Sequence, residues 1–189
     1  MSAALKTIQE ELKKNATSGH SGFLEKIVPG QQKAYGVKTP VLNQLARQYA
    51  QGSFALVKEL WKSGALEEQI IAIKIVEKIG KKEPEKVLPL FKQFSNGIKN
   101  WAVCDGLGMQ FLRGIVKTHA DEIFSLAGKL NHSKDSWQRR LSLVMVEWYT
   151  RDGAFHSQVK KLVKNLDDDE EYYVKKAIVW INNNLRKKR

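Results

Sequence analysis

Hydrophobic residues recur along most of the chain at intervals of three and four positions, which is the period of an amphipathic α-helix. No segment shows the sustained apolar and polar alternation that a half-buried strand requires. Short connections containing Gly, Asn, Ser or Pro separate the helical stretches. We therefore predict an all-α protein whose helices begin near Ser2, Thr39, Ser53, Leu66, Pro84, Asn100, His119, Lys134, Gly153 and Asp169.

Alternate predicted helices recur at a nearly constant spacing. The helices expected from positions 66, 100, 134 and 169 are separated by 34, 34 and 35 residues. This period is typical of an α-solenoid, in which each helix pair buries its apolar face only by stacking on its neighbours. The consensus of tetratricopeptide repeats is absent, which favours HEAT-like antiparallel pairs in one domain over residues 1–189. A plain helical bundle is the alternative.

The first 36 residues are expected to form an irregular helical cap. The motif Gly36-Val37-Lys38-Thr39-Pro40 predicts a helix start, with Gly36 closing a turn, Thr39 as the capping residue and Pro40 in the first turn. Before it, residues 18–22 are interpreted as a flexible connection, residues 23–28 as a short helix, and Pro29-Gly30 as a turn.

The chain carries a formal net charge of +12, from 32 Lys and Arg against 20 Asp and Glu. The excess is spread along the sequence, at +4 over residues 1–80, +5 over 81–140 and +3 over 141–189. A spread excess of this size favours a polyanionic partner, of which nucleic acid is the commonest, through the release of counterions. Solubility alone is the competing explanation.

Several other classes of chemistry find little support in the sequence. Cys104 is the single cysteine and the four histidines are far apart, so neither a disulfide nor a metal site is predicted. No phosphate-binding loop or other cofactor motif is present, and no cofactor is expected. The longest apolar stretch is too short to span a bilayer. We expect a cytoplasmic monomer without membrane contact.

The helix predicted from Asn100 carries the first candidate for chemistry. Trp101, Asp105, Gly108 and Leu112 share one face, so the indole ring and the carboxylate are neighbours one turn before a glycine. A π face beside a negative charge suits the stabilisation of positive charge that develops on a sugar carbon during cleavage of a glycosidic bond. The spacing alone favours a plainer role, with the Trp packed between repeats and the Asp salt-bridged.

The helices predicted from Lys134 and from Asp169 provide candidates for contact with DNA. The second of these carries a stripe formed by Tyr173, Lys176, Trp180 and Asn184. Such a stripe suits contact with a sugar–phosphate backbone, and the alternative is that it covers the previous repeat at the end of the solenoid. On the helix from Lys134, Arg140 can reach a phosphate and Arg139 is expected to meet only water. The remaining face of that helix is expected to be core, and no function is assigned to its tryptophans, Trp137 and Trp148.

Four segments, taken in order, resemble the AlkD-like alkylpurine DNA glycosylases across nearly the whole chain. They are Gly36-Val37-Lys38-Thr39-Pro40, Trp101-Ala102-Val103-Cys104-Asp105, Trp137-Gln138-Arg139-Arg140 and Lys176-Ala177-Ile178-Val179-Trp180. The resemblance implies a HEAT-like solenoid whose concave basic face binds duplex DNA. It implies an enzyme that removes 3-methyladenine or 7-methylguanine while the damaged base is still stacked in the duplex. It also implies catalytic roles for Asp105 and Trp101, and DNA contacts by Arg140 and Trp180.

The chain departs from the family pattern near its end. It stops soon after Trp180, and Asn183 stands where the family commonly has an arginine. Two alternatives therefore remain beside the repair enzyme. One is a DNA-binding relative without glycosylase activity, and the other is a helical scaffold for a protein partner.

Overall fold

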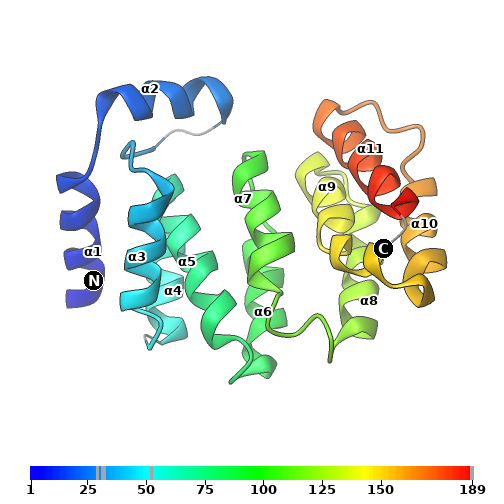
Figure 1. Cartoon of the computed structure of the whole chain (residues 1–189), viewed down its shortest axis with the longest axis horizontal. Helices are drawn as coiled ribbons and strands as arrows, with labels where there is room; N and C mark the ends of the chain where they lie inside the picture. The colour runs from blue at the N-terminus through cyan, green and yellow to red at the C-terminus, as the bar shows by residue number, and fades with distance from the viewer. Residues whose placement is uncertain (29, 31–32, 52, 188–189) are drawn as a thin grey trace.

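The computed structural model describes residues 1–28, 30, 33–51 and 53–187, and within these ranges every regular element is a helix (Figure 1). The prediction of an all-α protein is confirmed. None of the helices in the described ranges is long and apolar enough to span a membrane. The α-helices are α1 (Ala3–Lys14), α2 (Ser18–Ile27), α3 (Thr39–Gln48), α4 (Phe54–Lys62), α5 (Leu66–Ile79), α6 (Pro84–Phe94), α7 (Trp101–Asp105), α8 (Ala120–Asn131), α9 (Ser136–Val144), α10 (His156–Lys164) and α11 (Tyr172–Arg186).

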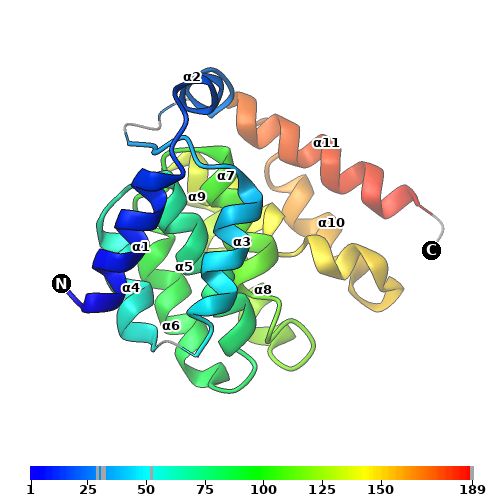
Figure 2. The same cartoon turned by 60° about the vertical axis from the view of Figure 1, so that its left-hand side comes forward.

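The helices form two rows (Figures 1 and 2). In one row α3, α5, α7, α9 and α11 contact one another in succession, and α4, α6, α8 and α10 pack against this row. Helices α5, α7, α9 and α11 begin at residues 66, 101, 136 and 172, close to the predicted period. The last of these starts three residues later than predicted, because the acidic run at 167–171 lies in the connection before α11.

The N-terminal region is more regular than the sequence suggested. Residues 18–22 are not a flexible connection, since they form the first half of α2, which lies crosswise at one end of the other helices (Figure 1). In the turn predicted at Pro29-Gly30, Pro29 falls outside the described residues. Gly30 has a φ of +81°. Thr39 does not cap α3; Lys38 occupies the cap position and Thr39 is the first helical residue.

A buried carboxylate on α5 holds the segment that leads from α2 into α3. Glu67 is 1% exposed, and its oxygens accept hydrogen bonds from the backbone N–H groups of Tyr35, Gly36 and Val37 at 3.0, 2.8 and 3.1 Å. Three such bonds compensate the desolvation of a buried charge. Beside it, the equally buried Glu68 accepts a 2.7 Å hydrogen bond from the Tyr35 hydroxyl.

Helix α7 continues without a break into a π-helical segment, η1 (Gly106–Phe111). Gly108, in η1, lies against the end of α9, and a Cβ atom on it would come within 2.6 Å of a Val144 methyl carbon. The extra residue in the π-helical turn also shifts the face that follows, so Leu112 is fully buried. The predicted surface stripe from Trp101 to Leu112 is therefore exposed only at Trp101 and Asp105.

Gly36 provides a test of how the N-terminal cap is held. Its φ is +80°, and a Cβ atom would lie 2.5 Å from the Thr17 carbonyl oxygen, so we expect Gly36→Ala to lower the free energy of unfolding by about 2 kcal/mol. Gly64→Ala is the matched control, because its φ is +73° but no atom lies within 4 Å of the added methyl. It should cost about 1 kcal/mol. Urea denaturation measures both, and equal losses would show that the contact with Thr17 is unimportant.

Candidate active site

Asp105 and Arg140 form a bidentate ion pair between α7 and α9. Arg140 Nη2 donates to Asp105 Oδ1 and Oδ2 at 2.8 and 3.0 Å, and its Nε donates to Oδ1 at 3.1 Å. The remaining nitrogen, Nη1, donates to the Tyr173 carbonyl oxygen at 2.6 Å. The pair therefore joins three successive helices of one row, α7, α9 and α11.

The two partners differ in how far solvent reaches them. The Arg140 side chain is 7% exposed, whereas that of Asp105 is 26% exposed. A carboxylate offers about four acceptor positions, and Arg140 occupies three of them. One side of the Asp105 carboxylate thus stays open to a positively charged group that approaches from solvent.

Burial raises the pKa of Asp105 above its ordinary value, and the Arg140 guanidinium opposes that rise through its charge and its hydrogen bonds. The guanidinium is therefore what keeps a largely buried carboxylate in its charged form. Arg140 turns inward to Asp105 and Tyr173, and the phosphate contact predicted for it stays a prediction.

Trp101 lies one helical turn from Asp105 and is half-buried, with part of its ring packed against the core. Its indole N–H donates a 2.7 Å hydrogen bond to the carbonyl oxygen of Ile27, the last residue of α2. Helix α2 is thereby fixed next to the start of α7. No sequence signal predicts this bond, because its acceptor is a backbone atom 74 positions away.

Trp137, which was predicted to lie in the core, is a neighbour of the site. Its ring is half-exposed and stacks on the Tyr173 ring, with centroids 5.0 Å apart and planes at 29°. Tyr173 is the residue whose carbonyl binds Arg140. The signal for this placement was present, since Trp137 lies three positions before Arg140 on the same helix.

The rest of the α11 stripe is divided between solvent and core. Lys176 is exposed, with its Nζ 4.8 Å from the centroid of the Tyr172 ring, and Trp180 is half-buried one turn further on. Asn184 does not belong to an exposed stripe, because it is 3% exposed and donates to Glu147 Oε1 at 2.9 Å. The structure thus brings Tyr173 to the ion pair, and places Lys176 and Trp180 further along the same helix.

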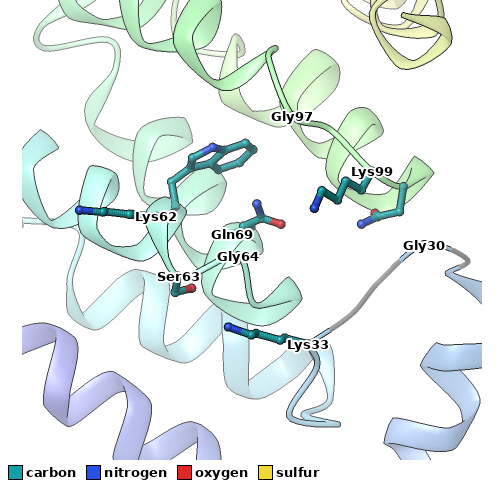
Figure 3. A pocket seen from close by; sticks show the side chains of 10 residues that line it. Gly30, Lys33, Lys62, Ser63, Gly64, Gln69, Gly97 and Lys99 are labelled. Atoms are coloured by element: carbon teal, nitrogen blue, oxygen red, sulfur yellow. The ribbon is translucent and has the colours of Figure 1, made fainter.

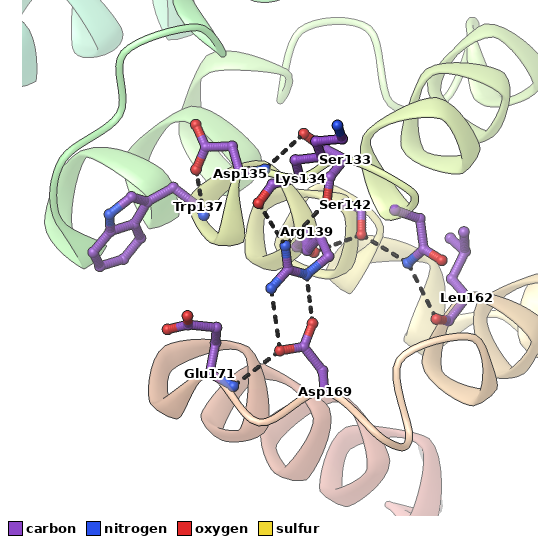
Figure 4. A network of polar contacts seen from close by, with 10 residues as sticks. Ser133, Lys134, Asp135, Trp137, Arg139, Ser142, Leu162, Asp169 and Glu171 are labelled. Atoms are coloured by element: carbon purple, nitrogen blue, oxygen red, sulfur yellow. Dashed lines mark hydrogen bonds and ion pairs between the residues drawn. The ribbon is translucent and has the colours of Figure 1, made fainter.

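Arg139 does not meet only water, as the sequence interpretation expected. Its Nε donates to Asp169 Oδ2 at 2.5 Å, and its Nη1 donates to the carbonyl oxygens of Ser133 and Lys134, both at 3.0 Å (Figure 4). The partner lies in the acidic run before α11, 30 positions away. This second ion pair ties the entry of α11 to the start of α9, and so helps to place Tyr173.

The face of α9 that was expected to be core is only partly so. Leu141 and Val144 are fully buried, but the helix ends at Val144, and Trp148 lies half-buried in the following 3-10 segment η2 (Glu147–Arg151). The indole N–H of Trp148 donates to the Met109 carbonyl at 2.9 Å, and the Arg151 guanidinium lies 4.3 Å from the centre of its ring.

Within the described ranges, no three His, Cys, Asp or Glu side chains gather in a way that would hold a metal ion. Cys104, next to Asp105, is fully buried, and this burial raises the pKa of its thiol. The groups that the site presents are the Asp105 carboxylate, the Arg140 guanidinium and the aromatic rings around them.

Residues 8–188 match the model of a protein family described as DNA alkylation repair enzyme. The chain belongs to the DNA alkylation repair enzyme family. The resemblance drawn from the four sequence segments is thereby confirmed at the level of the family. A comparison with individual curated proteins finds no match.

The site of this family member allows a test of how Arg140 controls Asp105. Arg140→Gln removes the charge that opposes the effect of burial, so we expect the pKa of the Asp105 carboxyl to rise further. Arg140→Lys keeps the charge without the bidentate geometry and should give a smaller rise. The carboxyl carbon resonance of Asp105, followed by NMR against pH, measures the change.

Arg113→Gln is the matched control, because it breaks the ion pair between Arg113 and Glu77 and touches neither Asp105 nor Arg140. It should leave the Asp105 titration unchanged. Equal titration curves for the wild type, Arg140→Gln and Arg113→Gln would contradict the assignment of Arg140 as the group that favours the charged form of the carboxylate.

Proposed function

We propose that this family member hydrolyses the N-glycosidic bond of cationic alkylated purines, such as 3-methyladenine and 7-methylguanine, in duplex DNA. The observation that carries the proposal is the Asp105 carboxylate, which Arg140 fixes in place on one side and which solvent reaches on the other. A preorganised negative charge at the rim of a low-dielectric site stabilises a transition state in which positive charge develops.

The reaction that we propose needs no general acid. Alkylation at N3 or N7 has already made the purine a cation, so it leaves as a neutral base with the electron pair of the glycosidic bond. Positive charge then develops on the C1′ carbon of the sugar, as in other glycosidic cleavages. Asp105 stabilises this charge and orients the water whose oxygen bonds to C1′, and one water proton passes to solvent.

Arg140 serves in this scheme as a positioning residue. Each of its three guanidinium nitrogens already donates to Asp105 or to the Tyr173 carbonyl, so the guanidinium determines where the carboxylate lies. The aromatic rings of Trp101 and Trp180 hold the strand on either side of the lesion, and Tyr173 and Lys176 add contacts to the sugar–phosphate backbone.

We further propose that the two rows of helices form a HEAT-like solenoid, and that the inner row provides a concave basic face for the duplex. Support comes from a cluster of basic side chains on successive inner helices. Arg47, Lys74 and Lys78 line one hollow between α3 and α5, and Arg113 follows beyond η1, where it pairs with Glu77. Clustered cations of this kind bind the phosphates of DNA regardless of sequence.

Asp105→Asn tests the proposed chemistry. It removes the charge but keeps the size of the side chain, so we expect the single-turnover rate of release of methylated purines from alkylated duplex DNA to fall by about 100-fold or more. Asp121→Asn, an exposed aspartate in the first turn of α8, makes the same chemical change away from the site and should retain the full rate.

Two other outcomes would favour other functions. Duplex binding that weakens steeply with salt, without release of bases by a folded wild type, would identify a DNA-binding relative that is not a glycosylase. Undetectable binding of the duplex would instead favour a scaffold for a protein partner. Equal rates for Asp105→Asn and the wild type would remove the carboxylate from the mechanism.

A further inference from the structure

A cationic pocket lies beside the start of α7 and outside the Asp105 site. It has a volume of about 420 Å³ and opens between the connections α2–α3, α4–α5 and α6–α7 (Figure 3). The described residues that line it include three lysines and no carboxylate, and their polar side chains are Lys33, Lys62, Lys99, Ser63, Gln69 and Asn100. The chemistry of this lining favours an anion.

The lysines are not equivalent. Figure 3 shows the Lys99 side chain directed toward Gln69 in the middle of the pocket, while Lys62 points away from it. Lys33, from the segment that enters α3, also lines the pocket, and in Figure 3 its side chain lies below that of Lys99 and is directed toward Ser63. We therefore expect Lys99 and Lys33 to provide the charge that a bound group meets.

The helix dipole accounts for one of the three lysines. A cation is favourable near the C-terminal end of a helix, which explains Lys62 in the last turn of α4. Lys99 lies just before the N-terminal end of α7, where a positive charge gains nothing from the dipole. Lys33 also lines a second hollow, together with Glu25 and Glu68.

The pocket lies next to the candidate active site in the chain. Lys99 is two residues before Trp101, which places their Cα atoms within about 7.6 Å of each other. One wall is formed by Gly30, and a Cβ atom there would lie 2.6 Å from the Lys99 carbonyl oxygen. Because a duplex carries one negative charge per about 1.7 Å of its axis, we expect a duplex held at Trp101 to have backbone phosphates near this pocket.

We propose that this pocket binds one phosphate group of the DNA backbone close to the lesion, held by Lys99 and Lys33. The inference rests on the proposed function, because a duplex must be seated at Trp101 for its backbone to reach the pocket. A single phosphate held at a defined position fixes the register of the strand against Asp105 without reading the base.

The first measurement is duplex affinity as a function of salt, with a duplex that carries a tetrahydrofuran abasic site so that no reaction occurs. We expect Lys33→Gln/Lys99→Gln to bind about ten-fold more weakly than the wild type and to lower the slope of log affinity against log salt by about 1. Lys6→Gln/Lys160→Gln removes the same charge from exposed positions on α1 and α10, and should change neither quantity by as much.

The second measurement locates the phosphate. A set of duplexes, each with one neutral methylphosphonate near the abasic site, is titrated with the wild type and with Lys33→Gln/Lys99→Gln. We expect one position to weaken binding of the wild type but not of the variant, because the variant has already lost that contact. Equal losses at every position would overturn the assignment of this pocket to the DNA backbone.

Inorganic phosphate distinguishes a small ligand from the duplex. If millimolar phosphate shifts the Gly97 amide resonance of the wild type while the methylphosphonate scan is flat, the pocket binds a free phosphate and the proposal is wrong. Loss of all duplex binding and base release by the wild type would overturn the proposed function itself. If the wild type binds the duplex and releases the base normally, and the two double variants have the same duplex affinity and salt slope, only the phosphate site is overturned.

Discussion

The ion pair between Asp105 and Arg140 is the interaction on which this account depends. Burial disfavours the charged form of the Asp105 carboxylate, and the Arg140 guanidinium on α9 opposes that effect. Because the same guanidinium also binds the Tyr173 carbonyl, the position of the carboxylate is set by three helices at once. Removing one partner of such a pair usually costs about 3 to 5 kcal/mol, because the other charge is left buried and uncompensated.

A second set of buried carboxylates acts at a distance on the same site. Glu67 binds the backbone from Tyr35 to Val37, and this segment follows α2, whose last carbonyl accepts the indole N–H of Trp101. The residues that enter α3 are therefore held by α5, and the end of α2 is held by the aromatic ring beside Asp105. On the other side, the pair of Arg139 and Asp169 fixes the entry of α11. Helix α7 is thus bound to α2 through Trp101 and to α9 through Asp105.

The sequence predicted the helices and their period well, because each repeat buries a regular apolar stripe and its ends are marked by caps and turns. For the same reason, it predicted that Trp101 and Asp105 are neighbours on one helix. The prediction failed where contacts between distant residues determine which side chains are buried or paired. Gly108 was expected at the surface but allows the close approach of α9, Arg139 was expected in water but meets Asp169, and Asn184 was expected on an exposed stripe but binds Glu147. Helical spacing alone cannot reveal partners 30 or more positions away.

The pH dependence of base release tests the central claim most directly. The kcat/KM of base release, corrected for spontaneous depurination, is compared with the NMR titration of the Asp105 carboxyl in the free protein, because kcat/KM reports the pKa values of the free enzyme. Because Asp105 acts in its charged form and burial raises its pKa above the ordinary aspartate value of 3.8, the account predicts that the rate falls as pH drops, with a midpoint at the pKa of Asp105. A rate that stays constant while Asp105 takes up its proton would contradict it.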